Sequence, residues 1–307
     1  MSELILKIRQ LGSSDLAWRF RSSPPVIFAT AVLALLVLCA AGANLIAPHN
    51  PFDPATLDIM DARIPPAWAD GGTTKYLLGT DEQGRDVLSS ILYGMRISIL
   101  VGMAAVLFSL TMGVTLGLIA GYFGGWIDTI IMRLGDVQLS FPTIMIAFFI
   151  DGIAKILMPI DMREEMRFYV VILAIGVADW VQFARTVRAS TMIERRKDYV
   201  AAARISKVGS LRIVASHILP NTIGPVLVLA TLGLGVAILT EAILSFLGLG
   251  MPPSQPSLGT LIRAGNDLLL SGEWWISLFP GAALVLLVLS VNIVGDWLRD
   301  VLNPRLR

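Results

Sequence analysis

The sequence predicts an all-α membrane protein, and three observations point to this class. The mean hydropathy of the 307-residue chain is +0.73, and only 15% of its residues are charged, against about 25% in an average soluble domain. Its apolar residues also gather in runs of about twenty, the length that a helix needs to cross a bilayer. Since a backbone cannot leave polar groups unpaired in lipid, these runs are expected to be helices.

Six such runs predict six membrane-spanning helices. The first follows a basic tail, and its length favours a retained anchor over a cleaved signal peptide. Near the end of the third, Asp151 and Lys155 lie four residues apart and are expected to pair on the protein surface. The predicted spans cover residues 26–46, 97–120, 137–157, 169–187, 223–246 and 276–294.

Lysine and arginine in the connections indicate how these helices are oriented. With six spans, both termini and the loop 188–222 lie on one side, where the connections hold 15 basic and 6 acidic residues. The segments on the other side hold 8 basic and 13 acidic residues. Because the basic side faces the cytoplasm, both termini and the loop are predicted to be cytoplasmic.

The domain organisation follows from these spans. Pro51, Pro54, Pro65 and Pro66 make the first part of the outer segment irregular. Neither this segment nor the other long outer connection, 251–275, is large enough for an independent domain. The predicted parts are a cytoplasmic tail (1–25), a first helix (26–46), a periplasmic segment (47–96), a five-helix core (97–294) that contains the loop 188–222, and a cytoplasmic tail (295–307).

Residues that catalysis or metal binding would require are absent or scattered. The single cysteine, Cys39, lies in the first span and is interpreted as a small buried apolar residue. His49 and His217 lie far apart and have no neighbours at ligand spacing. The chain has no phosphate-binding Gly-x-x-x-x-Gly-Lys-Ser/Thr, Gly-x-Ser-x-Gly or His-Glu-x-x-His motif. A net charge of +1 gives no indication of a nucleic-acid partner.

Three glycines at steps of four residues form a smooth stripe on the second span: Gly113, Gly117 and Gly121. Such a stripe lets another helix approach closely. The approaching helix can belong to this chain, which we favour, or to a second subunit.

Two acids lie within apolar runs, where a charged group is costly unless it faces protein or water. For Asp179 in the fourth span we favour a structural role. Glu241 precedes Ser245 and Phe246 near the outer end of the fifth span. A structural hydrogen bond and a place in a gate or substrate pathway are equally consistent with that position.

The basic stretch RRKDYVAAARISKVGSLRIVASHILPN (195–221) interrupts the apolar chain. Its residues favour a short helix over Asp198–Ile205, on which Tyr199, Ala202, Ala203 and Ser206 share one face. Pro220 is expected to break the backbone before the fifth span. A slim face with the basic neighbours Arg204 and Lys207 suits insertion into a groove of a partner. The residues alone are equally consistent with a basic loop that only sets the topology.

This stretch resembles the signature loop of permease subunits of bacterial ATP-binding cassette importers. In that family a Glu-Ala-Ala is followed by a glycine four residues later, and the loop ends in Leu-Pro. The chain differs from the family at Ala201, in place of the glutamate, and at Lys207, in place of the glycine, with Gly209 two positions late. It matches the family at Ala202, Ala203, Ile218, Leu219 and Pro220.

The resemblance extends over nearly the whole chain. Residues 77–102, 117–142, 241–262 and 295–307 are similar to the dipeptide, oligopeptide and nickel branch, in its "C" type that pairs with a related "B" type subunit. The segment 158–169 matches that branch poorly.

The resemblance implies a type I importer fold in a bacterial inner membrane and no catalysis by this chain. It implies a heterodimer with a second permease in membrane lipid, two cytoplasmic subunits that bind ATP and magnesium, and a periplasmic binding protein. No cofactor would bind to this chain, and di- or oligopeptides are the expected substrates. The expected ATPase-docking residues are Asp198, Tyr199, Ala201, Ala202, Ala203, Arg204, Lys207, Gly209, Ile218, Leu219 and Pro220.

The main alternative is a self-sufficient secondary transporter. It would need ion or proton sites near the middle of the membrane, often in repeated halves. Only Asp179 and Glu241 are available for such sites, and the sequence has no evident repeat. A membrane enzyme and a purely structural subunit are further alternatives.

Overall fold

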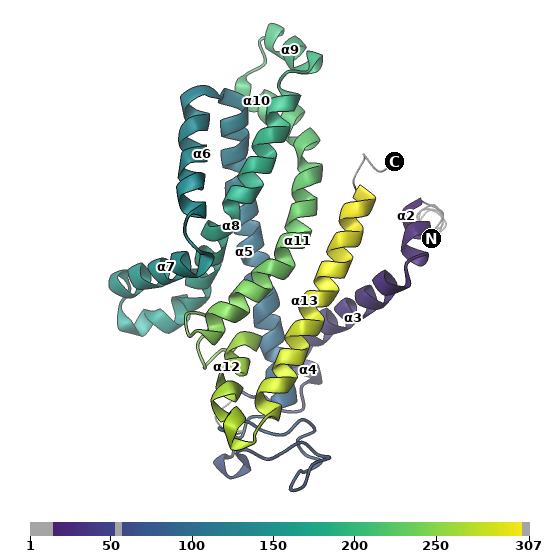
Figure 1. Cartoon of the computed structure of the whole chain (residues 1–307), viewed down its shortest axis with the longest axis vertical. Helices are drawn as coiled ribbons and strands as arrows, with labels where there is room; N and C mark the ends of the chain where they lie inside the picture. Colours follow the sequence, from purple (N-terminus) through teal and green to yellow (C-terminus); the bar gives the residue numbers. More distant parts are fainter. Residues whose placement is uncertain (1–14, 53–56, 303–307) are drawn as a thin grey trace.

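The computed structural model describes residues 15–52 and 57–302, and within these ranges the chain is helical, without a strand (Figure 1). Five continuous helical stretches are long and apolar enough to cross a membrane, and they correspond to five of the predicted spans. The predicted all-α membrane fold is therefore confirmed. Lys7, Arg9, Pro54 and residues 303–307 lie outside the described residues.

Four of the long helices, α5, α8, α11 and α13, are longer than the apolar runs that predicted them, because polar residues continue them, whereas α3 is shorter than its run. The α-helices are α2 (Asp15–Arg21), α3 (Pro24–Ala41), α4 (Ala43–Ile46), α5 (Val87–Phe123), α6 (Gly125–Leu139), α7 (Thr143–Leu157), α8 (Arg163–Glu194), α9 (Asp198–Ile205), α10 (Ser210–Ile213), α11 (Leu219–Phe246), α12 (Leu258–Leu268) and α13 (Trp275–Leu302). Short turns are η2 (Ile59–Asp61), η3 (Ile160–Met162), η4 (Val214–Ile218) and η5 (Leu269–Ser271).

The third predicted span is wrong as a single helix over 137–157. The chain there forms α6 and α7, which meet at an angle of 97°. Pro142 lies between them; it has no N–H to donate and disfavours a helical residue before it. The N–H groups of Met145 and Ile146 bond to the Pro142 carbonyl, so a new helix begins there. The structure has six spans only if this bent pair counts as one.

The glycine stripe of α5 lies against α8, the helix that α5 contacts most extensively. A Cβ atom at Gly113 would come within 2.5 Å of the Phe183 Cβ, and one at Gly117 within 2.6 Å of the Ala184 carbonyl oxygen. At Gly121 it would lie 2.7 Å from the Thr191 Cβ. The stripe thus permits close packing within this chain.

Polar side chains hold α6 against α8. Arg188 forms an ion pair with Asp128, and Trp180 donates its indole N–H to the Gln138 side-chain oxygen at 2.6 Å. These contacts connect α5, α6 and α8 into one packed unit.

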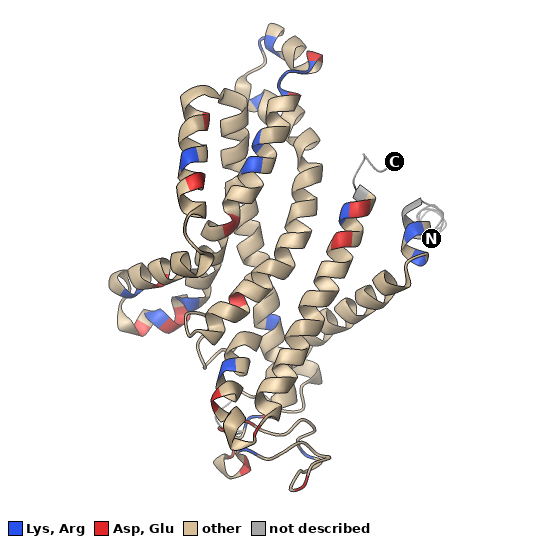
Figure 2. Ribbon diagram, in the orientation of Figure 1, with Lys and Arg blue, Asp and Glu red and all other residues tan. Residues whose placement is uncertain are grey.

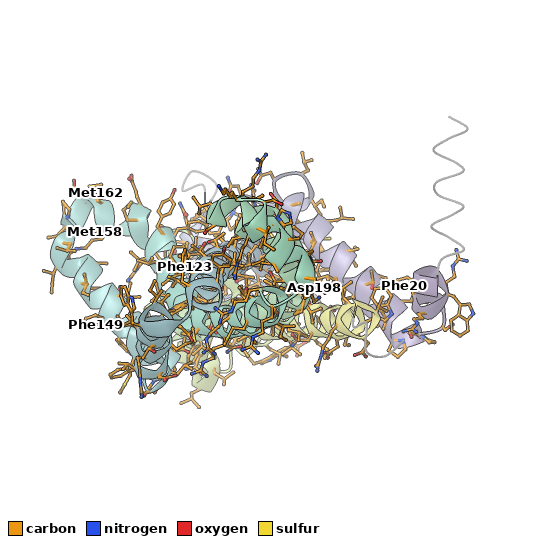
Figure 3. All side chains as sticks on the ribbon, turned by 90° about the horizontal axis from the view of Figure 1, so that it is seen from above. Phe20, Phe123, Phe149, Met158, Met162 and Asp198 are labelled. Atoms are coloured by element: carbon orange, nitrogen blue, oxygen red, sulfur yellow. The ribbon has the colours of Figure 1, made fainter. Side chains whose placement is uncertain are left out.

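Charged residues concentrate at the two ends of the molecule, along α6 and the nearby part of α8, and where α7 meets the start of α8, while the middle of α3 and of α13 bears none (Figure 2). Seen along the bundle, Phe149, Met158 and Met162 lie on the opposite side of the molecule from Phe20 (Figure 3). α2 and the last turns of α13 lie on the α9 side of the middle (Figure 1). That both termini share one side with α9, and that this side is cytoplasmic, stay predictions.

Candidate functional site

α9 lies at the end of the molecule farthest from α12 (Figure 1). Its bounds, Asp198–Ile205, are those expected for the short helix of the basic loop. It follows α8 and precedes α10, so it is attached to two long helices by short connections. A partner that contacts this end of the molecule therefore meets α9.

The two faces of α9 differ in burial. Val200 and Ala203 are buried, and they pack with Ile213 and Ile218 in one apolar cluster. The face predicted for docking is thus divided, since Ala203 points inward while Ala202 and Ser206 are exposed. The exposed residues with helical spacing, which we call the docking face, are Asp198, Ala201, Ala202 and Ile205.

Lys207 ends this helix in a left-handed conformation, with φ of 57°. The Val208 N–H bonds to the Ala203 carbonyl and the Lys207 N–H to the Arg204 carbonyl, the pattern of a Schellman C-cap. Glycine adopts this conformation without steric cost, whereas a side chain costs about 1–2 kcal/mol. The geometry gives a physical reason for glycine at this position and shows that lysine keeps the same cap.

Tyr199 joins α9 to both neighbouring long helices. Its hydroxyl donates to Glu194 in the last turn of α8, lies 3.4 Å from the His217 carbonyl oxygen and accepts from the Asn221 side-chain amide at 3.3 Å. Its ring stacks on His217 at 6.5 Å. Burial, and then the hydrogen bond to Glu194, raise the pKa of Tyr199 to about 12, so the hydroxyl stays a donor at physiological pH.

Pro220 does not break the backbone, contrary to expectation. It lies in the first turn of α11, and the chain is helical from Ser210 onward. Proline cannot donate to the carbonyl four residues earlier. The preceding residues form a π-helical turn instead, in which the Leu219 N–H bonds to Val214 five residues back, and the Asn221 amide bonds to the His217 carbonyl at 2.7 Å. π-turns inside helices often occur at functional sites.

Glu241, a candidate gate residue, is fully buried. Its carboxylate accepts the Ser98 hydroxyl at 2.8 Å and the Ser245 hydroxyl at 2.6 Å. Each serine in turn accepts a backbone N–H, from Leu258 and Met251 respectively. This network joins α5, α11 and the start of α12, as a structural role for Glu241 would require; a role in a gate or pathway stays the other hypothesis.

Of the other candidate pathway residues, only Ser245 is bonded to Glu241 within the described part of the chain. Asp179 is half-buried on α8 and forms no hydrogen bond or ion pair with any residue that the structure describes. Phe246 is 39% exposed at the end of α11. Because the partners of Glu241 are serines, the two acids of the apolar runs do not form a shared ion site.

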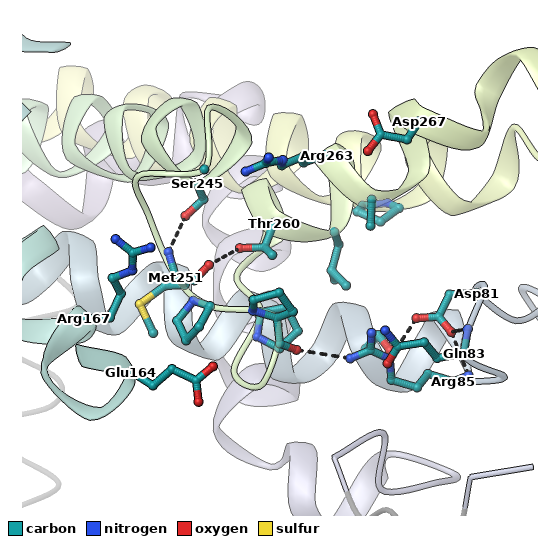
Figure 4. A pocket seen from close by; sticks show the side chains of 18 of the residues that line it. Asp81, Gln83, Arg85, Glu164, Arg167, Ser245, Met251, Thr260, Arg263 and Asp267 are labelled. Carbon is teal, nitrogen blue, oxygen red and sulfur yellow. Dashed lines mark hydrogen bonds and ion pairs between the residues drawn. The ribbon is translucent and has the colours of Figure 1, made fainter. Parts of the chain in front are cut away.

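A cavity of about 500 Å³ lies at the end opposite α9 (Figure 4). Its walls come from the outer segment, α7, α8, the loop after α11, α12 and the start of α13. Five acidic and five basic side chains line it: Asp81, Glu82, Asp151, Glu164, Asp267, Arg85, Lys155, Arg163, Arg167 and Arg263. No sequence motif marks this site, since its residues lie in four separate parts of the chain. The excess of acidic residues in the outer connections was the only signal.

Asp151 in this wall is not the surface residue that its spacing to Lys155 suggested. It is 5% exposed and forms ion pairs of 2.6 Å with both Lys155 and Arg167. Arg167 belongs to α8, so this cluster ties the bent α7 back to the long helix.

Two family descriptions match the sequence. "Binding-protein-dependent transport system inner membrane component" matches residues 113–307, and "N-terminal TM domain of oligopeptide transport permease C" matches residues 13–66. Dipeptide transport system permease protein DppC of Haemophilus influenzae is 39% identical over 274 residues, 89% of each chain. Di/tripeptide transport system permease protein DppC of Pseudomonas aeruginosa is 38% identical over 90% of this chain and 86% of its own. Dipeptide transport system permease protein DppC of Escherichia coli is 40% identical over 94% of this chain and 91% of its own.

Proposed function

This chain belongs to the family of binding-protein-dependent transport system inner membrane components, and we propose that it is one of two permease subunits of an ATP-driven importer of di- and oligopeptides. It is a multi-pass protein of the inner membrane. The peptide substrate is proposed from the names of its relatives, which are permeases of dipeptide and di/tripeptide transport systems.

The proposed assembly has four further components. A related second permease completes the pathway, two cytoplasmic subunits bind and hydrolyse ATP with magnesium, and a periplasmic binding protein delivers the peptide. No bond is made or broken on this chain. Its part is a rigid-body movement between inward-open and outward-open states, driven by contact with the ATPases.

The single observation that supports this proposal most directly is the construction of α9. Its docking face is exposed, whereas Val200 and Ala203 anchor the opposite face in the apolar cluster. Tyr199 connects the helix to the end of α8 and the beginning of α11. A displacement of α9 by an ATPase would therefore move both long helices together.

The test replaces Ala202 by glutamate, which places a charge in the middle of the docking face. We expect the chain to reach the membrane, while the ATPases no longer co-purify with it and peptide uptake is lost. Thr74→Glu, an exposed position in the outer segment, is the matched control and should retain both. Co-purification and uptake that survive Ala202→Glu would overturn the docking role.

The proposed sidedness has a separate test. In a background with Cys39→Ser, Ala202→Cys should react with a membrane-impermeant thiol reagent only after cells are opened. Thr74→Cys should react in cells whose outer membrane alone is permeabilised. The reverse pattern would show that α9 faces the periplasm and exclude contact with cytoplasmic ATPases.

A further inference from the structure

The cavity opposite α9 is balanced in charge, but several of its charged groups have no ionic partner. Arg85 pairs with Asp81 at 2.9 Å, and Asp151 is shared by two cations. Arg163 donates only to backbone carbonyl oxygens, of Met158 and Lys155. Within the described ranges, the charged side chains in this wall without a hydrogen bond or ion pair are Glu82, Glu164, Asp267 and Arg263.

Arg263 is the unpaired cation, and its guanidinium lies against the backbone of Gly248. A Cβ atom at Gly248 would come within 2.0 Å of the Arg263 Nη1, and this glycine has φ of 83°. Asp267 lies one turn further along α12 but does not pair with Arg263. The planar guanidinium is suited to bidentate binding of a carboxylate, and here none is supplied by the described chain.

The unpaired carboxylates lie on three parts of the wall: Glu82 on the outer segment, Glu164 on α8 and Asp267 on α12. Figure 4 shows Arg263 and Asp267 on α12, with Glu164 and Arg167 on α8 at another side of the cavity. A ligand between these walls can therefore meet a cation at one end and a carboxylate at the other.

Hydrogen bonds fix the loop that separates the two walls. The Met251 N–H donates to the Ser245 hydroxyl at 3.0 Å, and the Thr260 hydroxyl donates to the Met251 carbonyl at 3.1 Å. Arg85 donates to the Pro253 carbonyl at 3.3 Å. Three prolines of the loop, Pro252, Pro253 and Pro256, add apolar surface to the lining. The cavity thus combines a restrained apolar wall with a few polar groups, as small-molecule sites do, and its volume lies in their range of roughly 300–1,000 Å³.

We propose that this cavity binds a short zwitterionic peptide, with Arg263 receiving the terminal carboxylate and Glu164 the terminal ammonium. The choice of a peptide rests on the proposed function, and the choice of a zwitterion rests on the equal numbers of acidic and basic groups. A strongly anionic or cationic ligand would leave part of this lining uncompensated. The site would hold peptide at the outer end of the pathway before it passes between the permeases.

The experiment measures binding of dialanine to the assembled permease–ATPase complex in lipid nanodiscs, without a binding protein, by saturation-transfer NMR. Dialanine is expected to bind, and N-acetyl-dialanine amide, which lacks both charges, to bind at least about tenfold more weakly, since charge-assisted hydrogen bonds are the strong ones. Arg263→Gln should weaken the binding of dialanine to a similar extent but leave the binding of dialanine amide, which has no carboxylate, unchanged. Arg263→Lys should restore part of the affinity, and Glu164→Gln should weaken only peptides with a free ammonium.

Arg63→Gln is the matched control, because Arg63 pairs with Glu273 outside the cavity and should not affect binding. Equal binding of dialanine to the unchanged complex and to Arg263→Gln would overturn the proposal. The proposal would also be overturned if Arg263→Gln kept its affinity for dialanine and lost only its affinity for the binding protein. In that case the cavity would receive a segment of the binding protein. ATPase co-purification in the same samples separates these failures from failure of the proposed function.

Discussion

The replacement of Glu241 by alanine distinguishes a structural network from a gate. Both carboxylate oxygens are acceptors for buried serine hydroxyls. Alanine removes both acceptors, at about 1–3 kcal/mol for each hydroxyl left without a partner, and it leaves an unfilled volume. We therefore expect the free energy of unfolding to fall by about 4 kcal/mol or more.

Glutamine at the same position preserves the volume and one acceptor oxygen. Its amide must donate to the second serine, which already accepts a backbone N–H, so we expect a smaller loss of about 1–2 kcal/mol. At roughly 2–4 °C per kcal/mol, the value for domains of about 150–250 residues, the expected decrease in Tm is about 10 °C for Glu241→Ala and about 4 °C for Glu241→Gln.

The assay is thermal unfolding of the tagged chain in detergent, followed by size-exclusion chromatography, with peptide uptake measured in parallel. Ser109→Ala is the control, since this buried α5 serine bonds only within its own helix, to the Val106 carbonyl, and should change Tm little. A Glu241→Ala protein that melts like the unchanged chain but transports no peptide would refute the argument and make Glu241 a pathway residue.

Three further changes test other parts of the structure. Lys207→Gly relieves the left-handed strain at the end of α9 and should raise stability by about 0.5–1 kcal/mol in the same thermal assay; a decrease would mean that the lysine side chain stabilises the cap. Tyr199→Phe keeps the ring but removes the hydroxyl between α8, α9 and α11, so proteoliposomes should hydrolyse more ATP per imported peptide while ATPase co-purification persists; an unchanged ratio would refute the coupling role. Hydrogen bonds from Lys75 and then Tyr76 hold the pKa of Asp61 below its ordinary value of 3.8. Because the folded pKa is the lower one, this stabilisation is present above pH 3.8 and is lost as the pH falls through the folded pKa. Hydrogen exchange in residues 57–80, corrected for intrinsic rates, should therefore accelerate as the pH falls through the folded pKa. Asp61→Asn should abolish this pH dependence.

The α9 region illustrates how far local sequence patterns could be followed. Charged and turn-forming residues bound the helix on both sides, so its limits were predicted from the sequence alone. Its exposed face was displaced by one residue from the predicted one. The reason is that Ile213 and Ile218, which follow α9 in the chain, fold back and bury Val200 and Ala203.

The third span and Pro220 show the same limit for the backbone. A hydropathy pattern does not distinguish one straight span from the pair α6 and α7, which meet at 97°. Pro220 was expected to interrupt the chain, but a π-turn and the Asn221 side chain satisfy the neighbouring carbonyls and let the helix continue. Both outcomes depend on hydrogen bonds that the residue types permit but do not require.

The sequence by itself determined the membrane class, the approximate positions of the helices and the register of the basic stretch 195–221. Hydropathy, helix propensity and motif spacing are properties of adjacent residues, which is why they could be read from the sequence. Only the tertiary structure decided that Glu241 is held by serines of two helices, that Asp151 is buried between two cations, and that Arg263 and Glu164 face one cavity. These features arise between residues far apart in the chain, and their energies depend on burial and geometry that exist only once the helices have packed.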